Sequence, residues 1–337
     1  MSQELPPSLQ LMQVMFGFAP SRAIGVAAEL GIADLLQDGP KSAGELSRLT
    51  STHERSLYRV LRACASVGVF SEDEDKRFRL TPPAESLLSD VPGSLRSFVT
   101  LMTNDFQYQT WAELLYSVQT GEPAFDKVFG TSSFDYFWKN EKAGKVFNDA
   151  MSSNSAFSSA AVLEAYDFSA FSTIVDVGGG HGLLLASILK KYPRLRGILY
   201  DMPAIVEAAA DLIQSQGVAD RCERVGGSFF DSVPAGADAY IMKHIIHDWN
   251  DEQSLTILNN CREAMNPEGK VLVVEMVLPE GNEPSFGKFL DLQMLLYLRG
   301  CERTEAEYRQ LFGKAGLELT RILPTRSPFS IIEGIRK

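Results

Sequence analysis

The sequence predicts an α/β protein with a doubly wound, mostly parallel sheet in its C-terminal half and a mainly helical N-terminal half. Up to about residue 163, apolar residues recur at three- and four-residue spacing, which is typical of helices. After residue 171, short apolar runs alternate with helical stretches, as in strand–helix–strand units. An aromatic-rich helical stretch lies between the two patterns. We therefore expect three parts: residues 1–95, 96–168 and 169–337.

The first part has the element order of a winged helix. A helical run ends at the turn QDGPKS. After it we expect a short helix, an amphipathic helix from His53 to Val67, and two short strands around the acidic tip SEDEDK. Arg55, Arg59 and Arg62 on the amphipathic helix leave a DNA-binding interpretation open. Because an acidic tip repels a phosphate backbone, we favour a dimerisation module.

Composition narrows the possible partners. The chain has 337 residues, of which 45% are hydrophobic, and its 32 basic and 43 acidic residues give a net charge of −11. This balance disfavours nucleic acid and anionic membranes as partners. We find neither a basic–apolar leader nor an apolar run of ~18 residues, so we expect a cytoplasmic protein. The four cysteines are scattered without a C-x-x-C pair and predict neither a metal site nor disulfides.

Five strands are expected in the last part. They are the runs STIVDVGGGHG, LRGILYDMP, CERVGGSFF, ADAYIMKHI and GKVLVVEMVLP. Helical stretches separate them, and one of these begins near Glu252 with Asn250 or Asp251 as its cap. In such sheets, ligands bind at the carboxyl ends of the strands.

The glycine turn after the first strand indicates the ligand. The dinucleotide pattern G-x-G-x-x-G starts at Gly178 and Gly180, but its third position is Leu183. The turn therefore suits a cofactor without pyrophosphate, whose aminoacyl end approaches the glycine backbone while Asp176 engages an amine. This favours S-adenosylmethionine.

Two further residues are expected to bind this cofactor. Asp201 closes the second strand about 20 residues on, where a carboxylate accepts hydrogen bonds from both ribose hydroxyls; the alternative is a cap of the next helix. Lys243 ends the fourth strand and either meets a charge or amide of the cofactor or lies on the surface.

A candidate base follows that fourth strand, in MKHIIHDWNDE. His247 is expected next to the transferred methyl group, where a neutral imidazole takes a proton from an incoming phenol of pKa ~10. Either Glu275 or Glu302 is expected to accept the ring's other N–H and fix the tautomer. His244 is interpreted as a packed or surface histidine.

Asp248 has two interpretations. We expect it to contact the substrate, although Asp248, Asn250 and Asp251 together also offer oxygen ligands for magnesium. The spacing of the histidines does not fit H-E-x-x-H, and we expect no metal.

The motifs together resemble a known family, the small-molecule O-methyltransferases of the caffeic acid and acetylserotonin type. They are VDVGGGHG, YDMP, VGGSFF, MKHIIHDWNDE, VVEMVLP and ERTEAEYRQLFGKAGL, and FGTSSFDYFWKNEKAGKVFNDAMSSNS is similar to the family's helical linker. The resemblance implies a Rossmann-like sheet that binds S-adenosylmethionine and yields S-adenosylhomocysteine. It also implies a winged-helix-like dimerisation domain, and a partner subunit whose N-terminal segment contributes to the pocket.

The resemblance assigns residues as well. It implies a catalytic His247 flanked by Glu275 and Glu302, with Phe147 and Met151 lining the acceptor pocket. Where members commonly have Asp-Met against the adenine, this chain has Ser228 and Phe229, which still hydrogen-bond and stack.

The resulting hypothesis is a homodimeric enzyme that transfers a methyl group from S-adenosylmethionine to a hydroxyl of an aromatic small molecule. Two alternatives stay open at this stage. One is a relative that binds the cofactor but catalyses hydroxylation or decarboxylation. The other is a ligand-responsive winged-helix regulator.

Overall fold

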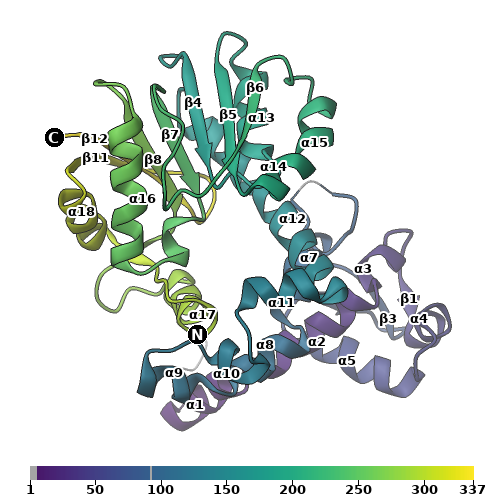
Figure 1. Ribbon diagram of the computed structural model, residues 1–337. Coiled ribbons are helices and arrows are strands. Elements are labelled where there is room, and N and C mark those ends of the chain that lie inside the picture. Colours follow the sequence, from purple (N-terminus) through teal and green to yellow (C-terminus); the bar gives the residue numbers. More distant parts are fainter. Residues whose placement is uncertain (1–5, 92) are drawn as a thin grey trace. The chain divides into compact units, whose positions relative to one another are not determined.

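The computed structural model describes residues 6–91 and 93–337, and these form two compact units (Figure 1). One unit comprises the chain up to Gln109 together with Phe137–Asn154. The other comprises Thr110–Tyr136 and Ser155–Lys337. The predicted domain boundaries at residues 95 and 168 stay predictions.

The first unit contains the winged-helix elements in the predicted order. Strands β1 (Lys41–Ser42), β2 (Phe70–Glu72) and β3 (Arg77–Leu80) form an antiparallel sheet in the order β1-β3-β2, and β2 and β3 flank the acidic tip. The helices are α1 (Pro7–Met15), α2 (Phe18–Glu29), α3 (Ile32–Leu35), α4 (Ala43–Thr50), α5 (Glu54–Ser66), α6 (Pro82–Glu85) and α7 (Arg96–Met102).

Local signals explain where these helices begin and which faces they bury. Helix α4 starts with a capping box. The Ser42 hydroxyl accepts a hydrogen bond from the Glu45 backbone N–H, and the Glu45 carboxylate accepts one from the Ser42 backbone N–H. Helix α5 buries Leu57 and Leu61 on one face, within a core that includes Phe70. The predicted helix from His53 to Val67 is confirmed.

The N-terminal helices have an unusually exposed apolar surface. Every residue of α1 is exposed, including Val14 at 78%. The stretch Pro7–Glu29 is long and apolar enough to cross a membrane by length and composition, whereas the sequence was expected to contain no such run. Signal sequences and core helices pass the same test, so this stretch by itself assigns no membrane location.

Five further helices connect these elements to the sheet. They are α8 (Asp105–Trp111), α9 (Leu114–Thr120), α10 (Ala124–Phe129), α11 (Ser133–Lys139) and the long α12 (Glu141–Ala165). Helix α12 belongs to the first unit up to Asn154 and to the second from Ser155.

The second unit is built on a seven-stranded sheet with the order β11-β12-β8-β7-β4-β5-β6. The five predicted strands are confirmed as β4 (Thr173–Val177), β5 (Arg196–Asp201), β6 (Cys222–Gly226), β7 (Ala239–Lys243) and β8 (Lys270–Glu275), all parallel to their neighbours within this group. The hairpin of β11 (Leu317–Pro324) and β12 (Ser330–Arg336) was not predicted and pairs antiparallel with β8.

Alternate residues of the strands face two separate hydrophobic cores. Ile174 packs in one core with α13 (Leu183–Lys191), α14 (Pro203–Ala208) and α15 (Ala210–Ser215). Val175 packs in the other core with α16 (Asp251–Ala264) and α18 (Glu305–Lys314). Helices therefore cover both faces (Figure 1), which confirms the doubly wound fold.

The strand order reverses beside β4. The chain leaves β4 for β5 and β6 on one side, and then returns to β7 and β8 on the other. In such sheets ligands bind at the carboxyl ends of the strands beside the switch point, which here are β4 and β7.

Candidate active site

The predicted site residues of the second unit gather at the carboxyl edge of the parallel strands. Asp176 lies in β4, and Asp201, Lys243 and Glu275 are the last residues of β5, β7 and β8. His247 lies in the 3-10 turn η1 (Ile246–Asp248), which follows β7 directly.

The glycine turn after β4 depends on its glycines. Gly178 and Gly180 have φ of 68° and 59°, in the left-handed region that disfavours side chains. A Cβ at Gly178 would lie 2.4 Å from Cδ1 of Ile245, whereas a Cβ at Gly180 would meet no atom within 4 Å. The backbone at Gly180 therefore borders open space.

Asp201 holds this turn in place. Its Oδ2 accepts a hydrogen bond from the Gly180 N–H at 2.8 Å, and its Oδ1 accepts from the Met202 N–H at 2.7 Å. The alternative role as a helix cap does not apply, because the N-cap of α14 is Met202 and no side chain caps it.

Asp176 is a buried carboxylate with a free acceptor. The residue is 1% exposed, and its Oδ2 has no hydrogen-bond partner within residues 6–91 and 93–337. Burial raises the pKa of Asp176 to about 7, although the charge of Lys243 counteracts the rise. Because an unpaired buried carboxylate is costly, this oxygen fits a donor from a ligand such as the amine of S-adenosylmethionine.

Lys243 points into the second unit and is not a surface residue. Its Nζ donates to the hydroxyls of Ser155 and Ser158 on α12. Burial lowers the pKa of Lys243 to about 8, and the negative charge of Asp176 opposes this shift.

Ser228 and Phe229 form a short turn after β6. Ser228 Oγ accepts from the Phe230 N–H at 3.3 Å. The Phe229 ring lies near Gly178 and 6.0 Å from the Trp249 ring, and Asn260 donates to the Phe229 and Phe230 carbonyls. An aromatic face thus borders the glycine turn.

His247 is held by Glu302. Its Nδ1 lies 2.7 Å from Oε1 of Glu302, which reaches the ring from 55 residues further along the chain. Both side chains are buried, at 10% and 0% exposed. Burial lowers the pKa of His247, but the charges of Glu275, Asp248 and Glu302 outweigh it and raise the pKa to about 10. Of the two predicted partners of the ring, Glu302 is the one that contacts it.

Glu275 binds the backbone of the turn. Its Oε1 accepts from the N–H groups of Ile245 and His247, each at 3.1 Å, and its Oε2 accepts from the Tyr308 hydroxyl at 3.0 Å. Tyr308 was not predicted as a site residue. It lies in the amphipathic helix α18, where an apolar core position is the simpler interpretation of a tyrosine.

Asp248 lies on the free side of the imidazole, with Oδ1 3.4 Å from Nε2 of His247. Burial raises the pKa of Asp248 to about 7, and the charge of His247 acts against this rise. His244 packs edge-on against Phe329, at 4.3 Å between ring centroids, as a packed histidine would. Burial and the charges of His247 and Lys243 lower the pKa of His244.

Two of the three residues weighed as magnesium ligands have structural roles at the start of α16. Asn250 caps α16 by accepting from the Gln253 N–H, and Asp251 pairs with Arg303. Atoms of His247, Glu275 and Glu302 do lie within 4.8 Å of one another, which is close enough to hold a metal ion. The oxygens of Glu275 already accept three hydrogen bonds, which leaves this carboxylate little capacity for a metal ion.

Phe147 and Met151 lie in the part of α12 that belongs to the first unit. The Phe147 ring stacks on that of Phe137, with centroids 4.6 Å apart and an interplanar angle of 9°. Both residues are half-buried.

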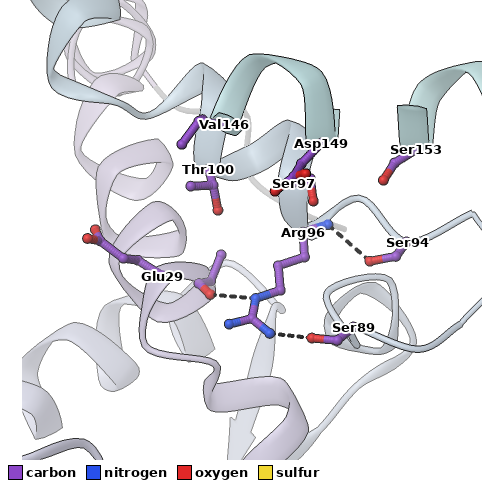
Figure 2. A pocket seen from close by; sticks show the side chains of 10 residues that line it. Glu29, Ser89, Ser94, Arg96, Ser97, Thr100, Val146, Asp149 and Ser153 are labelled. Carbon is purple, nitrogen blue, oxygen red and sulfur yellow. Dashed lines mark hydrogen bonds between the residues drawn. The ribbon is translucent and has the colours of Figure 1, made fainter. Parts of the chain in front are cut away.

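A separate cavity of about 340 Å³ lies within the first unit (Figure 2). Arg96 is at its centre, and hydroxyl groups such as that of Ser97 line it. The guanidinium already donates to Asp34, Ser89 and the Ala28 carbonyl, so its charge is engaged. This cavity contains none of the predicted site residues among those described, and we do not assign it to the reaction.

Two family models match the chain. The O-methyltransferase domain matches residues 111–318, and the O-methyltransferase dimerisation domain matches residues 12–90. The dimerisation interpretation of the winged helix is thereby confirmed.

Proteins that are similar along their whole length are named as methyltransferases. The chain is 48% identical to the phenazine O-methyltransferase PhzM of Lysobacter antibioticus over 98% of this chain and 96% of the relative. It resembles SAH-bound CalO1, a methyltransferase in calicheamicin biosynthesis, with a TM-score of 0.91 and 36% identity over 100% of both chains.

A third similar protein was solved with both the cofactor and an aromatic acid. The O-methyltransferase NcsB1 from neocarzinostatin biosynthesis, in complex with S-adenosylmethionine and 2-hydroxy-5-methyl naphthoic acid, matches with a TM-score of 0.79. The identity is 33%, over 94% of this chain and 96% of NcsB1. The chain therefore belongs to the S-adenosylmethionine-dependent O-methyltransferases that carry a dimerisation domain.

Proposed function

We propose that this enzyme methylates a hydroxyl of an aromatic small molecule and that His247 is the general base. The contact between Nδ1 of His247 and Glu302 at 2.7 Å carries the proposal. A carboxylate on Nδ1 fixes the tautomer whose other nitrogen, Nε2, accepts a proton. Nε2 lies on the side of Asp248, 3.4 Å from its Oδ1.

The charges around His247 suit a phenolic acceptor. A phenol has a pKa of ~10, so proton transfer to an ordinary imidazole of pKa ~6.5 is uphill by about 5 kcal/mol. The carboxylates raise the pKa of His247 against the effect of burial, which makes this proton transfer less uphill. Glu302 and Glu275 also stabilise the imidazolium that forms, and Asp248 is placed to orient the acceptor hydroxyl.

The cofactor supplies an electrophilic methyl group when it is bound. We assign its amine to Asp176, its aminoacyl end to the backbone of Gly178 and Gly180, and its ribose to Asp201. Lys243 supports this end of the site through its hydrogen bonds to α12. The proposed contacts of the adenine are a hydrogen bond to Ser228 and stacking on Phe229.

Two considerations support an aromatic acceptor. The relatives act, by their names, on phenazine or were solved with a naphthoic acid. Phe147 and Met151 are the side chains that we propose to line the acceptor pocket, where flat apolar groups pack well against an aromatic ring.

We further propose a homodimer that forms through the N-terminal part. Helix α1 exposes Leu11 at 62%, Val14 at 78% and Met15 at 65%, a surface that a second copy would bury. In this arrangement the partner's N-terminal segment contributes to the pocket, and protein rather than lipid covers the apolar stretch. That arrangement suits a cytoplasmic enzyme.

Substitution of His247 tests the mechanism. We expect His247→Ala to lower kcat with a phenolic acceptor by 10²- to 10⁴-fold, since this is the usual contribution of a general base. The measurement is transfer of a labelled methyl group from S-adenosylmethionine, with His53→Ala as a control at an exposed histidine. Unchanged turnover in His247→Ala would contradict the proposal, and product without label would indicate a different reaction.

A further inference from the structure

The turn η1, which carries His247, is held between two opposite charges. On one side, Oε1 of Glu275 accepts from the N–H groups of Ile245 and His247. These bonds fix the donors of the turn. Among its carbonyls, that of Ile246 accepts from the Trp249 N–H at 3.2 Å, and the Ser254 hydroxyl lies 3.3 Å from the carbonyl oxygens of both Ile246 and Trp249.

Arg303 adds charged donors to the same two carbonyls, on the other side of the turn from Glu275. Its Nη1 donates to the Ile246 carbonyl at 3.2 Å, and its Nη2 donates to the Trp249 carbonyl at 3.1 Å. The residue is 2% exposed, and its charge is paired with Asp251 at 2.9 Å. Only a planar guanidinium reaches two carbonyls and a carboxylate at once, because its donors form a rigid fork.

Arg303 also connects the turn to the partner of the base. It follows Glu302 directly, and the pair β9 (Val277–Leu278) and β10 (Arg303–Thr304) anchors this segment. A Cβ at Gly300 would lie 1.9 Å from the His247 carbonyl oxygen, so the segment packs directly on the turn. One short segment thus delivers both the carboxylate on Nδ1 and the guanidinium that binds the carbonyls of the turn.

We propose that Arg303 is a positioning residue that sets the distance between His247 and Glu302 by holding the carbonyls of Ile246 and Trp249. This inference rests on the proposed role of His247 as the base. A misplacement of about 1 Å in such a pair reduces turnover by about 10²-fold, so the clamp affects catalysis without contacting substrate.

The experiment compares Arg303→Lys and Arg303→Met with Arg309→Lys, a matched control on the exposed face of α18, where Arg309 pairs with Glu305. We expect the two Arg303 variants to lower kcat by about 10- to 100-fold with little change in the KM of either substrate. Acidic phenols, which ionise without a base, should lose less activity than weakly acidic ones. The control should match the wild type.

A second readout uses the free protein. Because the chain has only four histidines, the Nδ1–H signal of His247 in a ¹⁵N-histidine NMR spectrum is identified by its loss in His247→Ala. We expect this downfield signal to shift or disappear in Arg303→Lys and to persist in Arg309→Lys. If Arg303→Met does not fold, Asp251→Asn provides a milder test, because it weakens the ion pair and leaves the guanidinium; we expect a reduction of a few-fold in kcat.

The outcomes separate this inference from the proposed function. If His247→Ala loses activity while the Arg303 variants retain both kcat and the Nδ1–H signal, the positioning role is wrong and the base assignment stands. If His247→Ala stays active, the base assignment fails. In that case a shifted signal in Arg303→Lys would still support the clamp on the turn, and an unchanged signal would overturn it.

Discussion

The glycine turn and the base cluster are neighbours at the same sheet edge, but they are built in different ways. The turn consists of consecutive residues whose backbone borders open space at Gly180, and within the described part of the chain Oδ2 of Asp176 has no hydrogen-bond partner. The cluster joins His247 to Glu275 and Glu302, which lie 28 and 55 residues away along the chain, and hydrogen bonds from the backbone and ring of His247 to the two carboxylates hold it. The first region is prepared to receive a ligand, and the second is prepared to hold a proton.

This difference has an energetic consequence. A turn with an open acceptor gains its missing hydrogen bonds from the ligand, so substitutions there should mainly weaken binding. A buried cluster of three ionisable groups balances its own charges, so loss of one member should change the pKa values of the others and the rate of reaction.

The largest effect should come from Glu302→Gln. Loss of this charge lowers the pKa of His247 from its value of about 10, because Glu302 is one of the groups that raise it. In the wild type, neutral His247 becomes more abundant as pH rises, so kcat/KM should rise about tenfold per pH unit between pH 7 and 9. In the variant, the rise should level off at a lower pH and the plateau of kcat should fall by about 10- to 100-fold.

The effect is measured as a pH profile of kcat and kcat/KM, with a phenol that stays un-ionised between pH 7 and 9. Asp135→Asn, at an exposed carboxylate of α11, is a suitable control. An identical profile in Glu302→Gln would mean that the ring does not depend on this carboxylate.

An intermediate effect should separate two glycines of the turn. Gly178→Ala places a methyl group 2.4 Å from Ile245, so it should lower the free energy of unfolding by about 1–3 kcal/mol. Gly180→Ala has open space around its methyl group, so its stability loss should be smaller, about 1–2 kcal/mol from the left-handed backbone. Because the cofactor is proposed to approach through that space, the Kd of the Gly180→Ala variant for S-adenosylmethionine should rise by about tenfold.

Thermal unfolding and calorimetric titration measure the two quantities in each variant. Wild-type affinity in a folded Gly180→Ala protein would show that the cofactor does not approach the backbone at this position.

The smallest effect should come from Tyr308→Phe. The variant removes the donor to Oε2 of Glu275 and leaves a buried carboxylate oxygen unpaired, which costs about 1–3 kcal/mol of stability. The two N–H groups on Oε1 stay in place, so kcat should fall only a few-fold. Urea unfolding and steady-state kinetics at pH 7 test this. If the loss of kcat, expressed as a change in activation free energy, exceeds the loss in the free energy of unfolding, Tyr308 takes part in proton transfer.

The sequence determined much of the region where we propose that the cofactor binds. The five parallel strands, the glycine turn and the start of the helix at Asn250 or Asp251 follow from patterns within about ten residues, and these patterns act through local backbone geometry and through the alternation of buried faces. The position of His247 directly after β7 follows in the same way, because the strand ends just before it.

Only the tertiary structure decided how the carboxylates are used. The sequence left Glu275 and Glu302 equivalent as partners of the ring, and the fold gives Nδ1 to Glu302 and the turn backbone to Glu275. The antiparallel hairpin β11–β12 and the clamp by Arg303 likewise depend on contacts between distant segments. Local patterns cannot specify such contacts, because the register of packed elements sets which charges meet to within an ångström.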